Sequence, residues 1–122
     1  AHCEMLFSQE RPLDAFIDSY LSDWHQSSPD QGCPLPTMCS ELGLRGQPSP
    51  TTDAVLDARL KQIETALGEG RADAQALVMM STLVGALVLA RSVEDPQSAR
   101  RIMDVVRKCL KTQNPEDKKA DQ

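Results

Sequence analysis

The side chains of this sequence that could bind a metal ion or carry redox chemistry are its cysteines and histidines. It contains four cysteines and two histidines, namely Cys3, Cys33, Cys39, Cys109, His2 and His25. None of the cysteines forms a C-x-x-C pair, and the histidines do not follow zinc-finger spacing. We therefore expect no metal site and no cofactor, and we interpret the cysteines as reduced thiols that fill small spaces in a cytoplasmic protein.

Two of these residues leave a second interpretation open. Cys33 precedes a predicted helix start, where an activated thiol would allow redox sensing, although a filler role is commoner. His25 lies at the end of a predicted helix, where it could bind a ligand or respond to pH. A histidine at such a place is more often simply half-exposed, and we favour the structural interpretation for both residues.

An enzyme would need a nucleophile with a base, a pair of carboxylates or a metal cluster. The sequence has no E-x-x-H, H-E-x-x-H or G-x-S-x-G motif and no phosphate-binding glycine-rich loop. Its helical carboxylates are predicted to lie on solvated polar faces; they are Asp14, Asp18, Asp53, Asp57 and Glu64. We therefore expect that the chain is not an enzyme.

Length and composition indicate one helical domain. A chain of 122 residues is long enough for a single hydrophobic core. Apolar residues make up 40% of it but aromatic residues only 3%, and such an aliphatic core suits helix packing better than a sheet. The net charge of −5 makes the chain by itself a poor candidate for nucleic-acid binding.

The spacing of apolar residues predicts an all-α fold of five helices without strands. The first helix is expected over residues 12–25, and the second begins at Leu35 and ends at Gly43 or Gly46. After a break at 47–50, a third helix has Asp53 and Asp57 near its start and ends at Leu67. The fourth is expected over about 72–93, and the fifth from Asp95-Pro96 to about Leu110. Residues 12–113 would form the folded domain, preceded by a linker or connecting-helix remnant at 1–11 and followed by a disordered tail at 114–122. The apolar run Ala76–Ala90, about 15 residues, is too short to span a membrane and is predicted to be a largely buried helix.

One group of aromatic and methionine side chains is a candidate ligand pocket. It comprises Phe16, Tyr20, Trp24, Leu35, Met38, Met79, Met80 and Leu83. Trp24 ends an apolar stripe that begins at Leu13, and rings next to adaptable thioethers can line a cavity for apolar or aromatic ligands. The alternative is that these side chains only fill the core.

A second group is a candidate dimer interface, because the helix over 72–93 is apolar on nearly every side. The candidate residues are Ser81, Val84, Gly85, Val88, Ile102, Val106 and Cys109. Ser81 and Gly85 lie four residues apart and would let a partner helix approach closely, which suits a two-fold helical interface. The alternative is a core made within one chain.

Three segments resemble the TetR family of transcriptional regulators. The segment 32–43 reads GCPLPTMCSELG and is similar to the family's Gly-Cys-Pro-Leu-x-x-Leu-x-x-Glu-Leu pattern. The segment 80–107 reads MSTLVGALVLARSVEDPQSARRIMDVVR and resembles its last two helices with their Asp-Pro junction. RPLDAFIDSYL at 11–21 fits the helix that precedes the Gly-Cys segment.

The resemblance implies the C-terminal regulatory domain of a transcriptional repressor. In that family the last two helices form a four-helix bundle with the same helices of a second subunit. The earlier helices enclose a pocket for a small-molecule effector, which remains unidentified here. The family's helix-turn-helix is not found in this sequence, so operator DNA would be bound only through an N-terminal part outside it. The alternative is a stand-alone helical module that binds a protein or a ligand.

Overall fold

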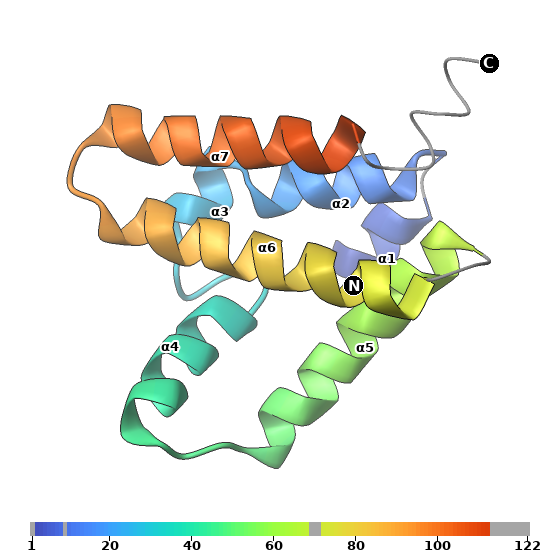
Figure 1. Cartoon of the computed structure of the whole chain (residues 1–122), viewed down its shortest axis with the longest axis horizontal. Helices are drawn as coiled ribbons and strands as arrows, with labels where there is room; N and C mark the ends of the chain where they lie inside the picture. Colours follow the sequence, from blue (N-terminus) through green and yellow to red (C-terminus); the bar gives the residue numbers. More distant parts are fainter. Residues whose placement is uncertain (1, 9, 69–71, 113–122) are drawn as a thin grey trace.

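The computed structural model describes residues 2–8, 10–68 and 72–112, which fold into an all-helical structure (Figure 1). Within these ranges the helices are α1 (His2–Phe7), α2 (Pro12–Tyr20), α3 (Asp23–Ser27), α4 (Leu35–Arg45), α5 (Pro50–Leu67), α6 (Ala72–Ser92) and α7 (Pro96–Thr112). The prediction of an all-α fold is confirmed for the described residues. The predicted disordered tail at 114–122 lies outside them.

The number of helices differs from the prediction, since seven are present in the described ranges instead of five. One addition is α1, which lies in the segment expected to be a linker or connecting-helix remnant. The other is α3, because the helix expected over 12–25 stops at Tyr20 and a new one begins at Asp23.

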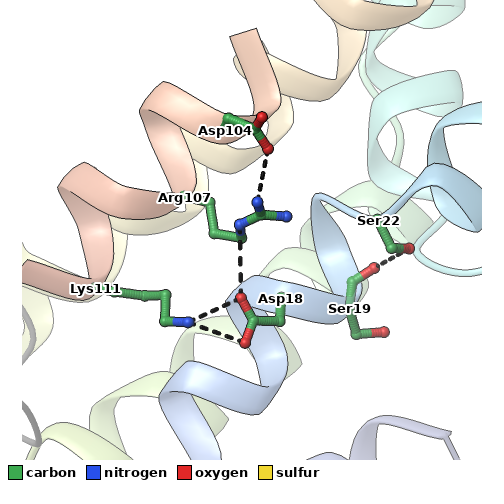
Figure 2. Close-up of polar contacts among 6 residues, drawn as sticks. All are labelled: Asp18, Ser19, Ser22, Asp104, Arg107 and Lys111. Atoms are coloured by element: carbon green, nitrogen blue, oxygen red, sulfur yellow. Dashed lines mark hydrogen bonds and ion pairs between the residues drawn. The ribbon is translucent and has the colours of Figure 1, made fainter. Parts of the chain in front are cut away.

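A serine between the two helices causes this break. Ser22 is the N-cap of α3, where its Oγ accepts a hydrogen bond from the backbone N–H of His25 at 3.2 Å. The same Oγ donates to the carbonyl of Ser19 at 2.7 Å (Figure 2). One hydroxyl therefore satisfies a backbone group at the end of α2 and another at the start of α3. The apolar spacing from Leu13 to Trp24 continues through the break and gives no sign of it.

Helix α6 lies at the centre of the fold and contacts α2, α3, α4, α5 and α7. It runs side by side with α7, while α4 and α5 extend away from it on its other side (Figure 1). The face of α6 that meets these helices is fully buried at Ala76, Leu83, Leu87 and Ala90. Burial of each leucine contributes about 1.5–3 kcal/mol.

Helix α6 is also the one helix of the described residues that is long and apolar enough to cross a membrane. Its most apolar window has a mean hydropathy of 1.7, and 39% of that window is buried inside the fold. The core helix of a soluble protein passes the same test, so this feature is weak evidence for a membrane span. The low buried share does show that much of this helix, which has no charged side chain between Asp73 and Arg91, faces outward.

An ionic cluster joins α2 to α7 (Figure 2). The Asp18 carboxylate accepts from Lys111 Nζ at 3.1 Å, and Arg107 Nε lies 3.8 Å from it. Arg107 also donates to Asp104 at 2.6 Å. Asp18, expected on a solvated polar face, therefore has interhelical partners, although its side chain remains 49% exposed.

We expect the substitution Asp18→Asn to lower the free energy of unfolding by less than about 1 kcal/mol, because ion pairs this exposed gain little net energy. The loss should shrink in high salt, which screens exposed charges. Urea unfolding in low and high salt measures both effects. The matched control is Asp57→Asn. It makes the same substitution but removes an ion pair to Lys61 within α5 instead of one between two helices. A loss that is large and independent of salt would contradict this account.

Candidate functional site

The structure places most of the predicted pocket residues in one buried cluster. Those almost completely buried are Phe16, Tyr20, Leu35, Met79, Met80 and Leu83. The Phe16 and Tyr20 rings have centroids 5.6 Å apart. Met38 is half-buried, and Trp24 is 46% exposed on α3. The sequence-based position of Trp24 on the same stripe as Phe16 is therefore wrong, because the chain is re-oriented between α2 and α3.

This buried cluster packs as part of the hydrophobic core. It contains one polar atom without a conventional hydrogen-bond partner among the described residues, the Tyr20 hydroxyl. Burial is the main cause that raises the pKa of this hydroxyl, and the Cys33 thiol beside it adds to the effect. Tyr20 is therefore protonated and offers an O–H group inside an otherwise apolar cluster. Such a group is what an apolar cluster would need in order to orient a ligand, and ligand binding by this cluster stays a prediction.

His25 is buried, with 2% of its surface exposed, so the expectation of a half-exposed ring is wrong. Its Nδ1 lies 2.7 Å from the Tyr20 carbonyl oxygen, which can only accept a hydrogen bond. Its Nε2 accepts from the backbone N–H of Cys33 at 3.2 Å. These partners assign a neutral ring with its proton on Nδ1. The ring thereby connects the end of α2 to the turn before α4, and we call this arrangement the His25 clasp.

Gly32 completes the His25 clasp by passing directly over the ring. Its φ of +75° lies in the left-handed region, which favours glycine. A Cβ at this position would lie 2.5 Å from His25 Cδ2, closer than real side chains approach. The Gly-Cys-Pro turn at 32–34 is thus shaped around the histidine, which explains the glycine in that motif.

A second connection holds α3 against the end of α6. Arg91 donates from Nη2 to the carbonyl of His25 and from Nε to the carbonyl of Gln26, the latter at 3.3 Å. In return, Gln26 Nε2 donates to the carbonyl of Ala90 at 3.3 Å. A guanidinium at the C-terminal end of α3 satisfies carbonyls that the short helix leaves open. Sequence reasoning missed this role of Arg91, because its partners are backbone groups.

The predicted interface residues lie on the outer part of α6 and α7. Ser81, Gly85 and Cys109 are exposed, while Val84, Val88, Ile102 and Val106 are half-buried. A Cβ added at Gly85 would meet nothing within 4 Å, so this glycine faces open space. The predicted set therefore lies on two adjacent helices, and three of its members, Val84, Ile102 and Val106, also pack against the core of the same chain.

Four larger apolar side chains that the sequence analysis did not name are also exposed on the same two helices. They are Leu77 at 50% exposure, Val78 at 62%, Leu89 at 56% and Val105 at 56%. Residues 74–90 of α6 contain no charged side chain. We call the outer surface formed by Leu77, Val78, Ser81, Gly85, Leu89, Ile102, Val105 and Cys109 the α6–α7 face. The missing charge on the outer side of α6 was the signal that could have identified its full extent.

Two surface hollows are described outside the core cluster. One, of about 470 Å³, is lined by Phe7, Pro12, Lys61, Gln62, Thr65 and Ala66. The other, of about 350 Å³, lies between α4 and the last turns of α6. Neither is lined by the residues predicted to form the ligand pocket.

The described residues contain no group of three or more cysteine, histidine or acidic side chains that could hold a metal ion. Comparison with models of known protein families, with curated proteins and with solved structures gives no match for this chain.

Proposed function

We propose that this chain is the effector-sensing and dimerisation domain of a TetR-type transcriptional repressor. The single observation that carries the proposal is the α6–α7 face, an exposed and uncharged surface on the two helices that such a domain would use to dimerise. DNA binding would belong to a head outside this chain. The motif likeness of residues 32–43 and 80–107 supports the same function.

Physical chemistry favours a covered α6–α7 face. Four large apolar side chains on these two adjacent helices are exposed, and an apolar patch of that kind is typical of an interaction surface. Ser81 and Gly85 provide a shallow strip along which a second helix can approach. The basic residues Arg101 and Lys108 are exposed on α7 beside this face, which suits the polar rim of an interface. A second copy of the chain offers the same complementary surface through a two-fold axis.

We expect the wild-type chain to be a dimer at tens of micromolar. Size-exclusion chromatography with light scattering measures its mass directly. A monomer under these conditions would remove the main support for the proposed domain type. It would favour the alternative function, a stand-alone helical module that binds another protein or a ligand.

The sensing part of the proposal concerns a small apolar or aromatic effector. The core cluster of Phe16, Tyr20 and Met79 is tightly packed, so a ligand there would have to displace side chains. An effector that acts at the surface of α4 and α6 would need no such opening.

A further inference from the structure

The hollow between α4 and the end of α6 has the size of a small-ligand site. Its volume is about 350 Å³, within the range of known ligand pockets. Its lining residues are Pro29, Pro36, Thr37, Ser40, Glu41, Val88, Arg91 and Ser92. Three different parts of the chain therefore form it, namely the turn after α3, the first turns of α4 and the last turns of α6.

Arg91 is the positively charged group of this hollow and has no carboxylate partner among the described residues. Its Nε and Nη2 donate to two carbonyls of α3, and no partner is found for Nη1 in the same part of the chain. Burial lowers the pKa of Arg91 because water has been removed from the charge. A bound anion would supply the carboxylate partner that Arg91 lacks, since the Glu41 carboxylate of the same hollow is paired with Arg45.

The other walls restrict which anion would fit. The hydroxyls of Thr37, Ser40 and Ser92 donate to backbone carbonyls, at 3.0, 2.7 and 2.6 Å. They have no proton left for a ligand, so the anion would rely on the single guanidinium. Glu41 is paired with Arg45 at 2.9 Å and would repel a multiply charged anion at the edge of the hollow.

The remaining wall is apolar. Pro29, Pro36 and Val88 line the hollow with hydrocarbon surface. A ligand with one carboxylate and an apolar body matches this combination, whereas phosphate has too much charge and no apolar part.

We propose that this hollow binds a small apolar monocarboxylic acid, with the carboxylate on Arg91 and the body against Pro36 and Val88. The site is separate from the core cluster. It would provide the effector site of the proposed function, but its existence does not depend on dimerisation. Arg91 also donates to the carbonyls of His25 and Gln26, so an acid bound to its guanidinium would act on the contact between α3 and α6.

The test is a titration of the wild-type chain at neutral pH with benzoate, followed by amide chemical shifts in ¹⁵N-labelled protein. We expect saturable shifts at the amides of Ser40 and Arg91 at millimolar benzoate. Benzyl alcohol, which has the same ring without the charge, should bind at least about tenfold more weakly. Inorganic phosphate should give no saturable shift at these amides. Equal binding of benzyl alcohol, saturable phosphate binding or an absence of shifts would each overturn the proposal.

Two variants locate the site. Ser40→Leu fills the hollow from the exposed side of α4 without touching the contacts of Arg91, and it should abolish the benzoate response. Arg91→Gln should weaken binding at least about tenfold, while Arg100→Gln, which removes an exposed arginine of α7, should leave it unchanged. If Arg91→Gln fails to fold, the result for Ser40→Leu still decides whether benzoate binds in this hollow. Benzoate binding that survives Ser40→Leu would place the site elsewhere and contradict the assignment. The mass of the protein, measured separately, reports on dimerisation and not on this site.

Discussion

Leu89→Glu should convert the chain from a dimer into a folded monomer. Leu89 is 56% exposed within one chain, so a glutamate there can be solvated in the monomer and should not disturb its fold. In a dimer built on the α6–α7 face, the same carboxylate would be buried without a partner, at a cost of about 3–5 kcal/mol. That cost corresponds to a loss of affinity of more than about a hundredfold. Light scattering gives the mass, and circular dichroism confirms that the helices are retained.

Gly85→Leu tests the same face by shape instead of charge. A leucine there has free space in the single chain but would push away a helix packed on the strip of Ser81 and Gly85. Ala58→Glu, which adds the same charge as Leu89→Glu at an exposed position of α5, is the matched control and should remain dimeric. Val88→Glu should also dissociate the dimer, but Val88 lines the hollow near Arg91 and therefore separates the two sites less well. Retention of the dimer in both Leu89→Glu and Gly85→Leu would exclude this interface.

The long helices were predictable because their signals lie in their own residues. The predicted helices, one over about 72–93 and one from Asp95-Pro96 to about Leu110, agree closely with the observed Ala72–Ser92 and Pro96–Thr112, since Asp95-Pro96 marks a helix start. The break expected at 47–50 ends earlier than predicted, since α5 already begins at Pro50. Its N-cap is Ser49, which accepts from the backbone N–H of Thr52 at 3.1 Å and precedes the apolar residues. Local capping decides boundaries that apolar spacing cannot define.

The contacts around α3 could not be predicted because they use backbone groups of distant residues. His25 and Arg91 bond to carbonyls and an amide, and a sequence does not show where such groups will lie in space. The exposure of Trp24 has a local cause instead, since the break after Tyr20, capped by Ser22, turns its side chain away from the stripe and does not show in the apolar spacing. By contrast, the apolar positions of α2 before the break, such as Leu13 and Ile17, were correctly predicted to be buried.

The His25 clasp should contribute strongly to stability, and we expect His25→Leu to lower the free energy of unfolding by about 2–5 kcal/mol. A leucine fills much of the space of the ring but leaves the Tyr20 carbonyl and the Cys33 amide without partners. Each buried group left unpaired costs about 1–3 kcal/mol. Urea unfolding followed by circular dichroism measures the loss. A change below about 1 kcal/mol would show that water or a local shift satisfies both groups, and that the ring is not needed to hold the turn.

Gly32→Ala tests the His25 clasp at the glycine that passes over the ring, and Gly46→Ala is its matched control. Gly32 and Gly46 both have a positive φ, of +75° and +65°, so an alanine at either position bears a similar backbone strain of about 1–2 kcal/mol. Only at Gly32 would the new Cβ also meet the histidine ring, whereas at Gly46 nothing lies within 4 Å. We therefore expect Gly32→Ala to be more destabilising than Gly46→Ala by about 1–3 kcal/mol, the usual cost of overpacking in a core. The excess should disappear in the His25→Ala background, where no ring opposes the methyl group. Equal losses for the two glycine variants, or an excess that persists without the ring, would mean that Gly32 is required for its backbone conformation alone.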